Sequence, residues 1–305
     1  MKVLLPLALV SLVYATDLLV PLYPPPSEWG PVETAVKNNP SVTAKIIINP
    51  SNGPTASPSD DFRAGTQALS SNANAQLIGY VHTGVVTNGV VVPCERPVDD
   101  VKADIRTWSS WVTNEIIIHG IFIDEAPVDA SNNCTAYMQD LTAFIKGDPS
   151  LKFASPRIVV FNPGQPGVGG LKAYYAQDPA PDLIVALENC FTTPDKALGF
   201  DTTGDDCPPT GGYAIYDKDG YGSSIDTYLS VDVGVDNYPK TAIIVHGFHD
   251  TNGNITASSA TLLEEIRTVK QKGIGAVFFN TFAYFQFGTP PADIGSVAAD
   301  LAAVN

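Results

Sequence analysis

Two adjacent acids end an apolar stretch in the middle of the chain. Asp124 and Glu125 directly follow the apolar run 120–123. A short apolar run bounded by polar residues is consistent with a buried strand, so both acids are expected at a strand end. Carboxyl groups that lie close together in a partly buried site repel each other's charge, which raises the pKa of one of them. One group can then donate a proton while its neighbour stays ionised, so the pair indicates acid–base catalysis.

A third acid is expected to complete the site. Side chains alternate along a strand, so Asp124 and Glu125 are expected to point to opposite sides unless the strand has already ended. Glu188 closes another apolar run, 183–187, and is the predicted partner of Asp124 across the mouth of the fold. The predicted catalytic residues are therefore Asp124, Glu188 and Glu125. Two carboxyl groups cleave a glycosidic bond with retention when they are roughly 5 to 5.5 Å apart and with inversion at roughly 6.5 to 9.5 Å.

Further polar side chains follow other apolar runs of the chain. They carry amide, imidazole and phenol groups, which suit hydrogen bonding to sugar hydroxyls, whereas a phosphate ligand would require Lys or Arg. His249 belongs to the same group of strand-end residues. The predicted substrate-binding residues are Tyr23, Asn49, Tyr80, His82, Asn162, His246 and Asn280.

Eight short, β-branched apolar runs recur along the chain and are the predicted strands. They cover residues 18–23, 45–49, 77–82, 120–124, 157–161, 183–188, 242–246 and 276–280. Helices are predicted between several of them, over residues 29–38, 60–70, 98–113, 136–145 and 260–271. Strands that alternate with helices are typical of parallel βα units, and nearly continuous apolar strands indicate burial on both faces.

The expected fold is α/β, a (β/α)8 TIM-type barrel that forms a single domain over residues 16–305. The chain of 305 residues is long enough for such a barrel, which takes roughly 250. An open doubly wound sheet is the alternative, but eight units without a nucleotide-binding fingerprint fit a closed barrel better. The Gly-, Asp- and Pro-rich segment 192–238 is the least regular part, and residues 212–216 form a candidate extra strand within it. In a barrel the strand-end residues gather at one mouth.

The N-terminal segment predicts export from the cell. Lys2 precedes the apolar run 3–13, and Val13-Tyr14-Ala15 has the small-residue spacing of a signal-peptidase site. Residues 1–15 are interpreted as a signal peptide, with a buried strand over 3–15 as the alternative. The run is shorter than the roughly 20 apolar residues that span a bilayer. We expect a secreted protein of the extracellular space or cell wall, with no membrane association.

Cysteines and glycosylation sequons agree with export. In an oxidising compartment four cysteines favour two disulfides over a metal site. Sequence proximity favours one of the three possible pairings, in which the last two cysteines are joined and the first two are left to each other. Asn133 and Asn254 each begin an Asn-X-Thr sequon and are predicted glycosylation sites. The cysteines are Cys94, Cys134, Cys190 and Cys207.

Charge and motifs exclude several classes of function. The net charge of −15 argues against nucleic-acid binding, because no basic surface is available for phosphates. An anionic protein suits neutral or cationic partners, and the charge also keeps an exported protein soluble. His246-Gly247 resembles an oxyanion loop, but no GxSxG motif is present, which excludes a typical serine esterase. A metal site at His246, His249 and Asp250 is disfavoured by its spacing. We expect a monomer with no cofactor and no metal.

Several of these segments together resemble one protein family. Leu19-Val20-Pro21-Leu22-Tyr23-Pro24, the run 46–54, Gly79-Tyr80-Val81-His82-Thr83 and the run 120–126 with its Asp-Glu pair are similar to spherulation-specific family 4. The resemblance extends from Leu18 to Asn280. The sequence departs from the family pattern after Thr83, where an apolar segment that reaches Cys94 replaces a more polar or aromatic turn.

The resemblance implies both an activity and roles for the acids. The family includes glycoside hydrolase family 135, so it implies a barrel that acts as a retaining endo-hydrolase on α-1,4-linked N-acetylgalactosamine in fungal galactosaminogalactan. The family's acidic pair matches Asp124 and Glu125, and its later strand-end glutamate is best matched by Glu188. We expect Asp124 to be the nucleophile or charge stabiliser, Glu188 the general acid/base and Glu125 a substrate contact, although the first two roles are exchangeable. The alternative is a wall or spore-coat protein that binds polysaccharide without cleaving it.

Overall fold

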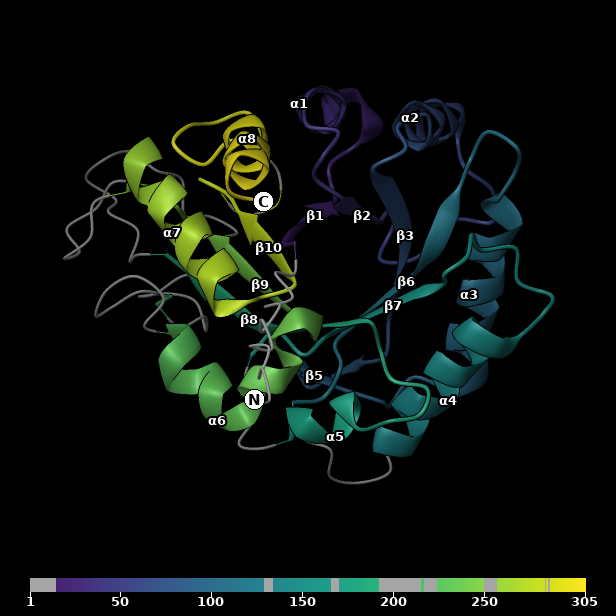
Figure 1. Ribbon diagram of the computed structural model, residues 1–305. Coiled ribbons are helices and arrows are strands. Elements are labelled where there is room, and N and C mark those ends of the chain that lie inside the picture. The colour runs from purple at the N-terminus through teal and green to yellow at the C-terminus, as the bar shows by residue number, and fades with distance from the viewer. Residues whose placement is uncertain are drawn as a thin grey trace, which may run out of the picture.

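A closed barrel of parallel strands forms the centre of the protein (Figure 1). The computed structural model describes residues 15–128, 134–165, 170–191, 215–216, 224–249, 257–282, 284 and 286–305. The barrel strands are β1 (Asp17–Leu22), β2 (Ala44–Ile48), β3 (Ala75–His82), β6 (Ile118–Asp124), β7 (Ile158–Asn162), β8 (Leu183–Cys190), β9 (Thr241–His246) and β10 (Ala276–Phe279). Their order around the barrel is β1-β10-β9-β8-β7-β6-β3-β2. All eight predicted strands are present, which confirms the (β/α)8 fold and shows that the open-sheet alternative is wrong.

Helices surround the barrel on its outer side (Figure 1). The five predicted helices correspond to α1, α2, α3, α4 and α7, whereas the short helices α5 and α6 and the C-terminal α8 were not predicted. α8 packs against α1 and α7 and so covers the junction between β10 and β1. The helices are α1 (Gly30–Asn38), α2 (Asp60–Ser70), α3 (Val98–Trp111), α4 (Cys134–Gly147), α5 (Leu171–Tyr175), α6 (Ser230–Asp232), α7 (Ser259–Lys272) and α8 (Ile294–Val304), with short 3-10 or π turns at Pro26–Glu28, Ile225–Leu229 and Val235–Lys240. None of the described helices is long and apolar enough to cross a membrane.

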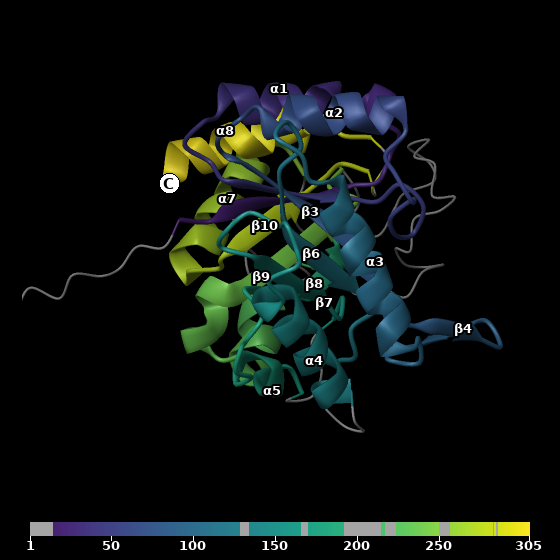
Figure 2. The ribbon, with the colours of Figure 1, turned by 90° about the vertical axis from the view of Figure 1, so that its right-hand side faces the viewer.

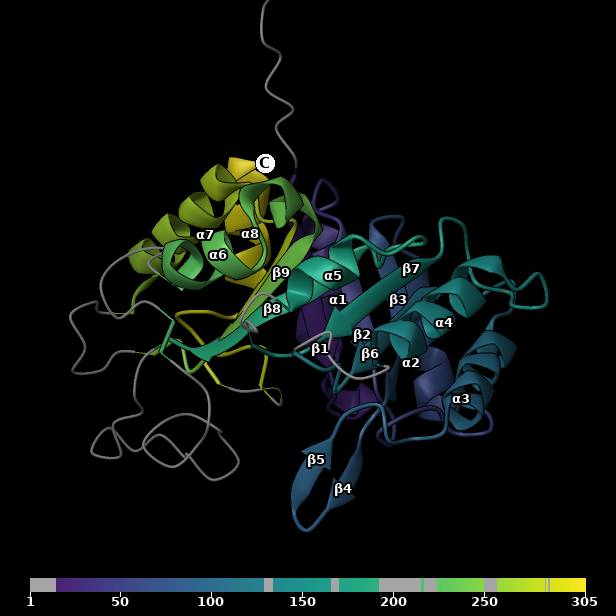
Figure 3. The ribbon, with the colours of Figure 1, turned by 90° about the horizontal axis from the view of Figure 1, so that it is seen from below.

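A two-stranded hairpin projects from the carboxyl-end face of the barrel (Figures 2 and 3). Its strands, β4 (Val85–Thr87) and β5 (Val90–Val92), pair antiparallel and follow directly after β3. Asn88 and Gly89 both have positive φ angles, as a two-residue hairpin turn requires. The apolar segment that departs from the family pattern is therefore a hairpin whose valines are largely exposed. The sequence analysis did not predict it.

Disulfides fix the loops of the same face. Cys94, just after the hairpin, is bonded to Cys134 at the start of α4, which confirms this predicted pair. Cys190 is disulfide-bonded as well, whereas its expected partner Cys207 lies outside the described residues. Ile215 forms an isolated bridge with Cys190, and the other residues of the candidate strand 212–216, apart from Tyr216, also lie outside them.

Other predictions fall on parts of the chain that the structure does not describe. Residues 1–14 of the expected signal peptide are among them, as are the sequon residues Asn133 and Asn254. Asp250 of the disfavoured metal site is also outside the described residues. These expectations stay predictions.

Strand β3 is held against helix α3 by a close contact of backbone and indole. The Trp108 side chain is fully buried, and its Nε1 donates a hydrogen bond to the carbonyl oxygen of Tyr80 at 2.8 Å. The indole lies directly on Gly79, where a Cβ atom would come within 2.4 Å of the ring. A glycine at position 79 is therefore required for α3 to approach β3, the strand that carries Tyr80 and His82.

We expect Gly79→Ala to destabilise the protein by about 1–3 kcal/mol, because the added methyl group overpacks the contact with Trp108. Gly147→Ala is the matched control, since nothing lies within 4 Å of a Cβ atom there. That change is expected to be neutral or to stabilise the protein by about 0.5–1 kcal/mol through the unfolded chain. Thermal and denaturant unfolding of both variants would check this. Equal midpoints for the two would contradict the close-contact argument.

Candidate active site

Three neighbouring strands carry polar residues to the same mouth of the barrel. Asp124 ends β6 and Asn162 ends β7, and the two residues are partners in the parallel register. Glu188 lies near the end of β8, where its backbone N–H donates to the carbonyl oxygen of Gly164 at 2.8 Å. Parallel strands of a closed barrel end on one face, so the three side chains meet there.

The two predicted acids share one hydrogen-bond donor. Asn162 Nδ2 donates to Asp124 Oδ1 at 2.8 Å and to Glu188 Oε2 at 3.1 Å. The separation of the two carboxylate oxygens cannot exceed the sum of these two distances. That limit lies below the roughly 6.5 Å at which the spacing of inverting glycosidases begins. Asp124 and Glu188 therefore form a close acid pair bridged by Asn162.

Each acid also has a phenol of its own. The Tyr80 hydroxyl donates to Asp124 Oδ2 at 2.6 Å, and the Tyr284 hydroxyl donates to Glu188 Oε1. Tyr284 lies in the loop after β10 and was not among the predicted site residues. A signal was present, because the segment 281–287 after the last strand contains four aromatic residues. This group of aromatic residues directly after a predicted strand is the signal that could have identified Tyr284 as a site residue.

An arc of aromatic rings connects the two phenols around the mouth. The ring of Tyr23 lies 5.9 Å from that of Tyr80 and 5.3 Å from that of Tyr284, centroid to centroid. His246, buried at the end of β9, lies 5.8 Å from the Tyr284 ring. We call Tyr23, Tyr80 and Tyr284 the tyrosine arc. It forms a wall of aromatic surface whose two ends are hydrogen-bonded to the two acids.

The environment of Asp124 favours its protonated form. Burial, followed by the negative charge of Glu188, raises the pKa of Asp124 to about 6, against the opposing hydrogen bond from Tyr80. Burial and the neighbouring Asp124 charge also raise the pKa of the Tyr80 hydroxyl far above its usual range, so Tyr80 remains a donor. Coupled acids of this kind hold a proton jointly. The pair can thus keep one proton and one negative charge in mildly acidic solution.

Glu125 lies beside the acid pair and turns towards another loop. Strand β6 has ended at Asp124, and Glu125 has a φ of 55°. Its Oε2 accepts from the backbone N–H of Gly84 at 3.0 Å and lies 3.3 Å from His82 Nδ1. The hydrogen bond from His82 is the main cause that holds the pKa of Glu125 below its usual range. Glu125 and His82 therefore fasten the start of the hairpin loop to the end of β6.

The remaining predicted residues occupy different positions around the mouth. Asn280 and His249 are almost fully buried next to the ends of β10 and β9. Asn49 follows β2, and its Oδ1 accepts a hydrogen bond from the backbone N–H of Gly53 at 3.0 Å, which is a turn contact. Of the seven predicted binding residues, Tyr23, Tyr80, Asn162 and His246 thus adjoin the acid pair or the tyrosine arc.

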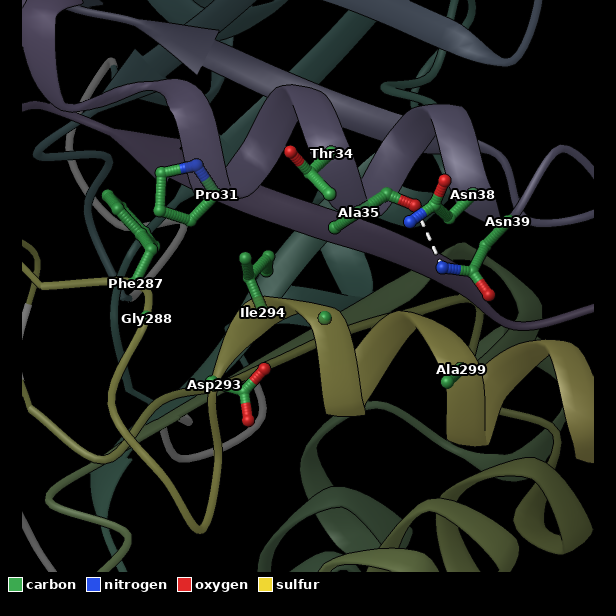
Figure 4. A pocket seen from close by; sticks show the side chains of 11 residues that line it. Pro31, Thr34, Ala35, Asn38, Asn39, Phe287, Gly288, Asp293, Ile294 and Ala299 are labelled. Atoms are coloured by element: carbon green, nitrogen blue, oxygen red, sulfur yellow. Dashed lines mark hydrogen bonds between the residues drawn. The ribbon is translucent and has the colours of Figure 1, made fainter.

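One surface pocket lies elsewhere, between α1 and α8 (Figure 4). Pro31 and Ala35 line it from α1, and Phe287 and Ile294 line it from the C-terminal side. Asp293, its one carboxyl group, caps α8 by accepting from the backbone N–H of Ser296 at 3.0 Å. No predicted site residue lines this pocket.

Known proteins share both the sequence pattern and the fold. Spherulin-4 of Physarum polycephalum is 37% identical over 115 residues, which make up 37% of this chain and 31% of that protein. The match thus spans about a third of the length of this curated relative. Sph3 of Aspergillus clavatus, solved in complex with GalNAc, has a TM-score of 0.68 at 22% identity, over 95% of this chain and 98% of that one. The catalytic domain of a family GH18 chitinase from the fern Peteris ryukyuensis has a TM-score of 0.55 at 14% identity, over 94% and 100% of the two chains.

The two structural matches show a common barrel, and the family follows from the sequence. The model of spherulation-specific family 4 matches residues 17–294, which is nearly the whole of the barrel described above. The matched range includes the acid pair, its bridging asparagine and all three members of the tyrosine arc. The chain therefore belongs to spherulation-specific family 4.

Proposed function

We propose that this protein is a secreted glycoside hydrolase that cleaves an amino-sugar polysaccharide. The observation that carries the proposal is the close pair of Asp124 and Glu188, bridged by Asn162 at the barrel mouth. Paired carboxyl groups in such a position are the machinery of most glycosidases. The tyrosine arc beside them offers apolar ring faces together with polar edges, a combination that suits sugar rings.

The separation of the pair supports a retaining mechanism. Glu188 in its acid form would donate its proton to the leaving glycosidic oxygen as the bond to the anomeric carbon breaks. Asp124 would stabilise the positive charge on that carbon and form a glycosyl ester with it. Water would then displace Asp124, giving its proton to Glu188 and restoring the pair. The two roles are exchangeable, because each carboxyl group accepts hydrogen bonds at both of its oxygens and the pair can share one proton.

The substrate is proposed to be a polymer of N-acetylgalactosamine such as galactosaminogalactan. Membership of the family supports this choice, as does the complex of the structural relative Sph3 with GalNAc. The net charge of −15 would not repel a neutral polymer and would attract a partly deacetylated, cationic one. Glu125, fastened to His82 and Gly84, is proposed to contact the substrate only at the rim of the site.

Removing either member of the acid pair is expected to abolish hydrolysis. Asp124→Asn and Glu188→Gln should each lower kcat on galactosaminogalactan by about 10²–10⁴-fold, since each removes an acid–base or nucleophilic step. The release of new reducing ends measures this, with Glu115→Gln, an exposed glutamate, as the matched control. Binding of the polymer by the unaltered protein without any product would instead indicate a carbohydrate-binding wall or coat protein.

The product is expected to keep the anomeric configuration of the substrate. Two displacements at one carbon restore its configuration, and the shared donor keeps the carboxyl groups within the range that this mechanism needs. Proton NMR of the first products, recorded before mutarotation, would show the α anomer. An initial β anomer would rule out the proposed glycosyl ester.

Activity is expected to fall as the pH rises through about 6, because the pair then loses the proton that the leaving group needs. The Tyr80 hydrogen bond lowers the pKa of Asp124, so Tyr80→Phe should raise this pKa and move the alkaline limb to higher pH. Profiles of kcat/KM against pH measure the shift. Tyr175→Phe is the control, because it removes a buried hydroxyl group that is hydrogen-bonded to Thr241. Its alkaline limb is expected to stay in place. A limb that stays in place or moves down in Tyr80→Phe would count against the pair as the titrating unit.

A further inference from the structure

The two acids fix the orientation of the Asn162 side chain. Its amide nitrogen lies between Asp124 Oδ1 and Glu188 Oε2, both of which are acceptors. The reversed amide would place a third oxygen against two carboxylate oxygens and leave both without a donor. Asn162 Oδ1 is therefore turned away from the acid pair, and it can act only as an acceptor.

This oxygen is buried, and its hydrogen-bonding capacity is unused. Asn162 is 8% exposed, and Oδ1 has no hydrogen-bond partner among the described residues. Buried polar atoms in proteins almost always have partners, so an exception at a functional site calls for an explanation, and a donor group of a bound ligand provides one. The missing partner must be a donor, because the carbonyl oxygen cannot donate.

Gly164 keeps the space beside this oxygen free of side chains. The residue has a φ of 70°, and a Cβ atom there would lie 3.3 Å from Glu188 Oε2 and 3.9 Å from Asn162 Oδ1. The hydrogen bond from the Glu188 backbone N–H to the Gly164 carbonyl oxygen holds this loop against β8. Any side chain at position 164 would start in the space that these two oxygens face.

We propose that Asn162 Oδ1 and Gly164 form a subsite that accepts one hydrogen bond from a neutral N–H or O–H donor of an N-acetylhexosamine bound at the acid pair. Asn162 then has two separate functions: its nitrogen positions the acids, and its oxygen recognises the sugar. The identity of the ligand rests on the proposed function. The existence of an acceptor subsite rests on the geometry alone, so the two can fail separately.

The test is to fill the subsite while both acids keep their chemical identity. Gly164→Ala places a methyl group in the space, and Gly273→Ala is the matched control. Gly273 has a similar φ of 79°, but nothing lies within 4 Å of a Cβ atom there. Both variants thus place a side chain on a residue with positive φ. Dissociation constants for N-acetylgalactosamine and for galactose would be measured by calorimetry or NMR titration, independently of hydrolysis, beside the thermal unfolding of each variant.

We expect Gly164→Ala to weaken N-acetylgalactosamine binding by about tenfold relative to Gly273→Ala, the loss of roughly one hydrogen bond. If galactose binding is weakened equally, the donor is a hydroxyl group common to both sugars or the group at C2, where galactose carries a hydroxyl in place of the acetamido group. If galactose binding is unaffected by the change, the donor is the acetamido N–H. Equal affinities in the two variants, or no binding of either sugar by the unaltered protein, would overturn the subsite. A weakened affinity in a protein that never hydrolyses the polymer would preserve the subsite and reject the hydrolase.

Asn162→Ala provides the second variant, which decides the matter if Gly164→Ala does not fold. It removes both the acceptor and the shared donor. Binding of N-acetylgalactosamine should fall by a similar factor, and the alkaline limb of kcat/KM should also move to higher pH, since both acids lose a donor. Unchanged sugar affinity in Asn162→Ala would contradict the proposal.

Discussion

Two carboxyl groups held against one amide nitrogen are the constraint on which the barrel mouth depends. Two negative charges about 5 Å apart repel each other by about 3 kcal/mol at an effective dielectric constant of about 20. Donors from Asn162, Tyr80 and Tyr284 offset this cost and keep both side chains in place. Burial, followed by the negative charge of Glu188, still raises the pKa of Asp124, which is the property that acid–base chemistry uses.

Closure of the barrel is what allows these donors to converge. Tyr80 belongs to β3, whereas Tyr284 follows β10, and the two are far apart in the sequence. Strand β1 pairs with both β2 and β10, so Tyr23, just beyond the end of β1, stands between them. An open sheet would have left β1 and β10 at separate edges and divided the tyrosine arc. The acid pair of β6 and β8 is thus completed from the opposite side of the ring.

The sequence was sufficient to predict the elements whose patterns are local. Each barrel strand is an apolar run, and Asp124, Asn162 and Glu188 could be placed at strand ends because the runs stop there. The hairpin 85–92 was missed although Asn88-Gly89 is a typical two-residue hairpin turn, because its valines were interpreted as part of an apolar loop. Helix α8 also carried a local signal that was missed, because its buried residues Ile294, Val297, Ala298 and Leu301 repeat at helical spacing. Tyr284 lies five residues beyond its strand, where only the tertiary fold determines what it contacts. The turn of the Glu125 side chain away from the acid pair depends on the positive φ angle of that residue.

The Cys94–Cys134 bond has a consequence for how a polymer enters. It covalently joins the segment after β5 to the start of α4, while Glu125 fastens the beginning of the same segment to the end of β6. The disulfide limits how far the segment after β5 can move from the start of α4, and the hydrogen bond to Glu125 holds the beginning of the segment beside β6. If the proposed function holds, a polysaccharide that passes the acids would meet a covalently restrained edge on this side of the mouth.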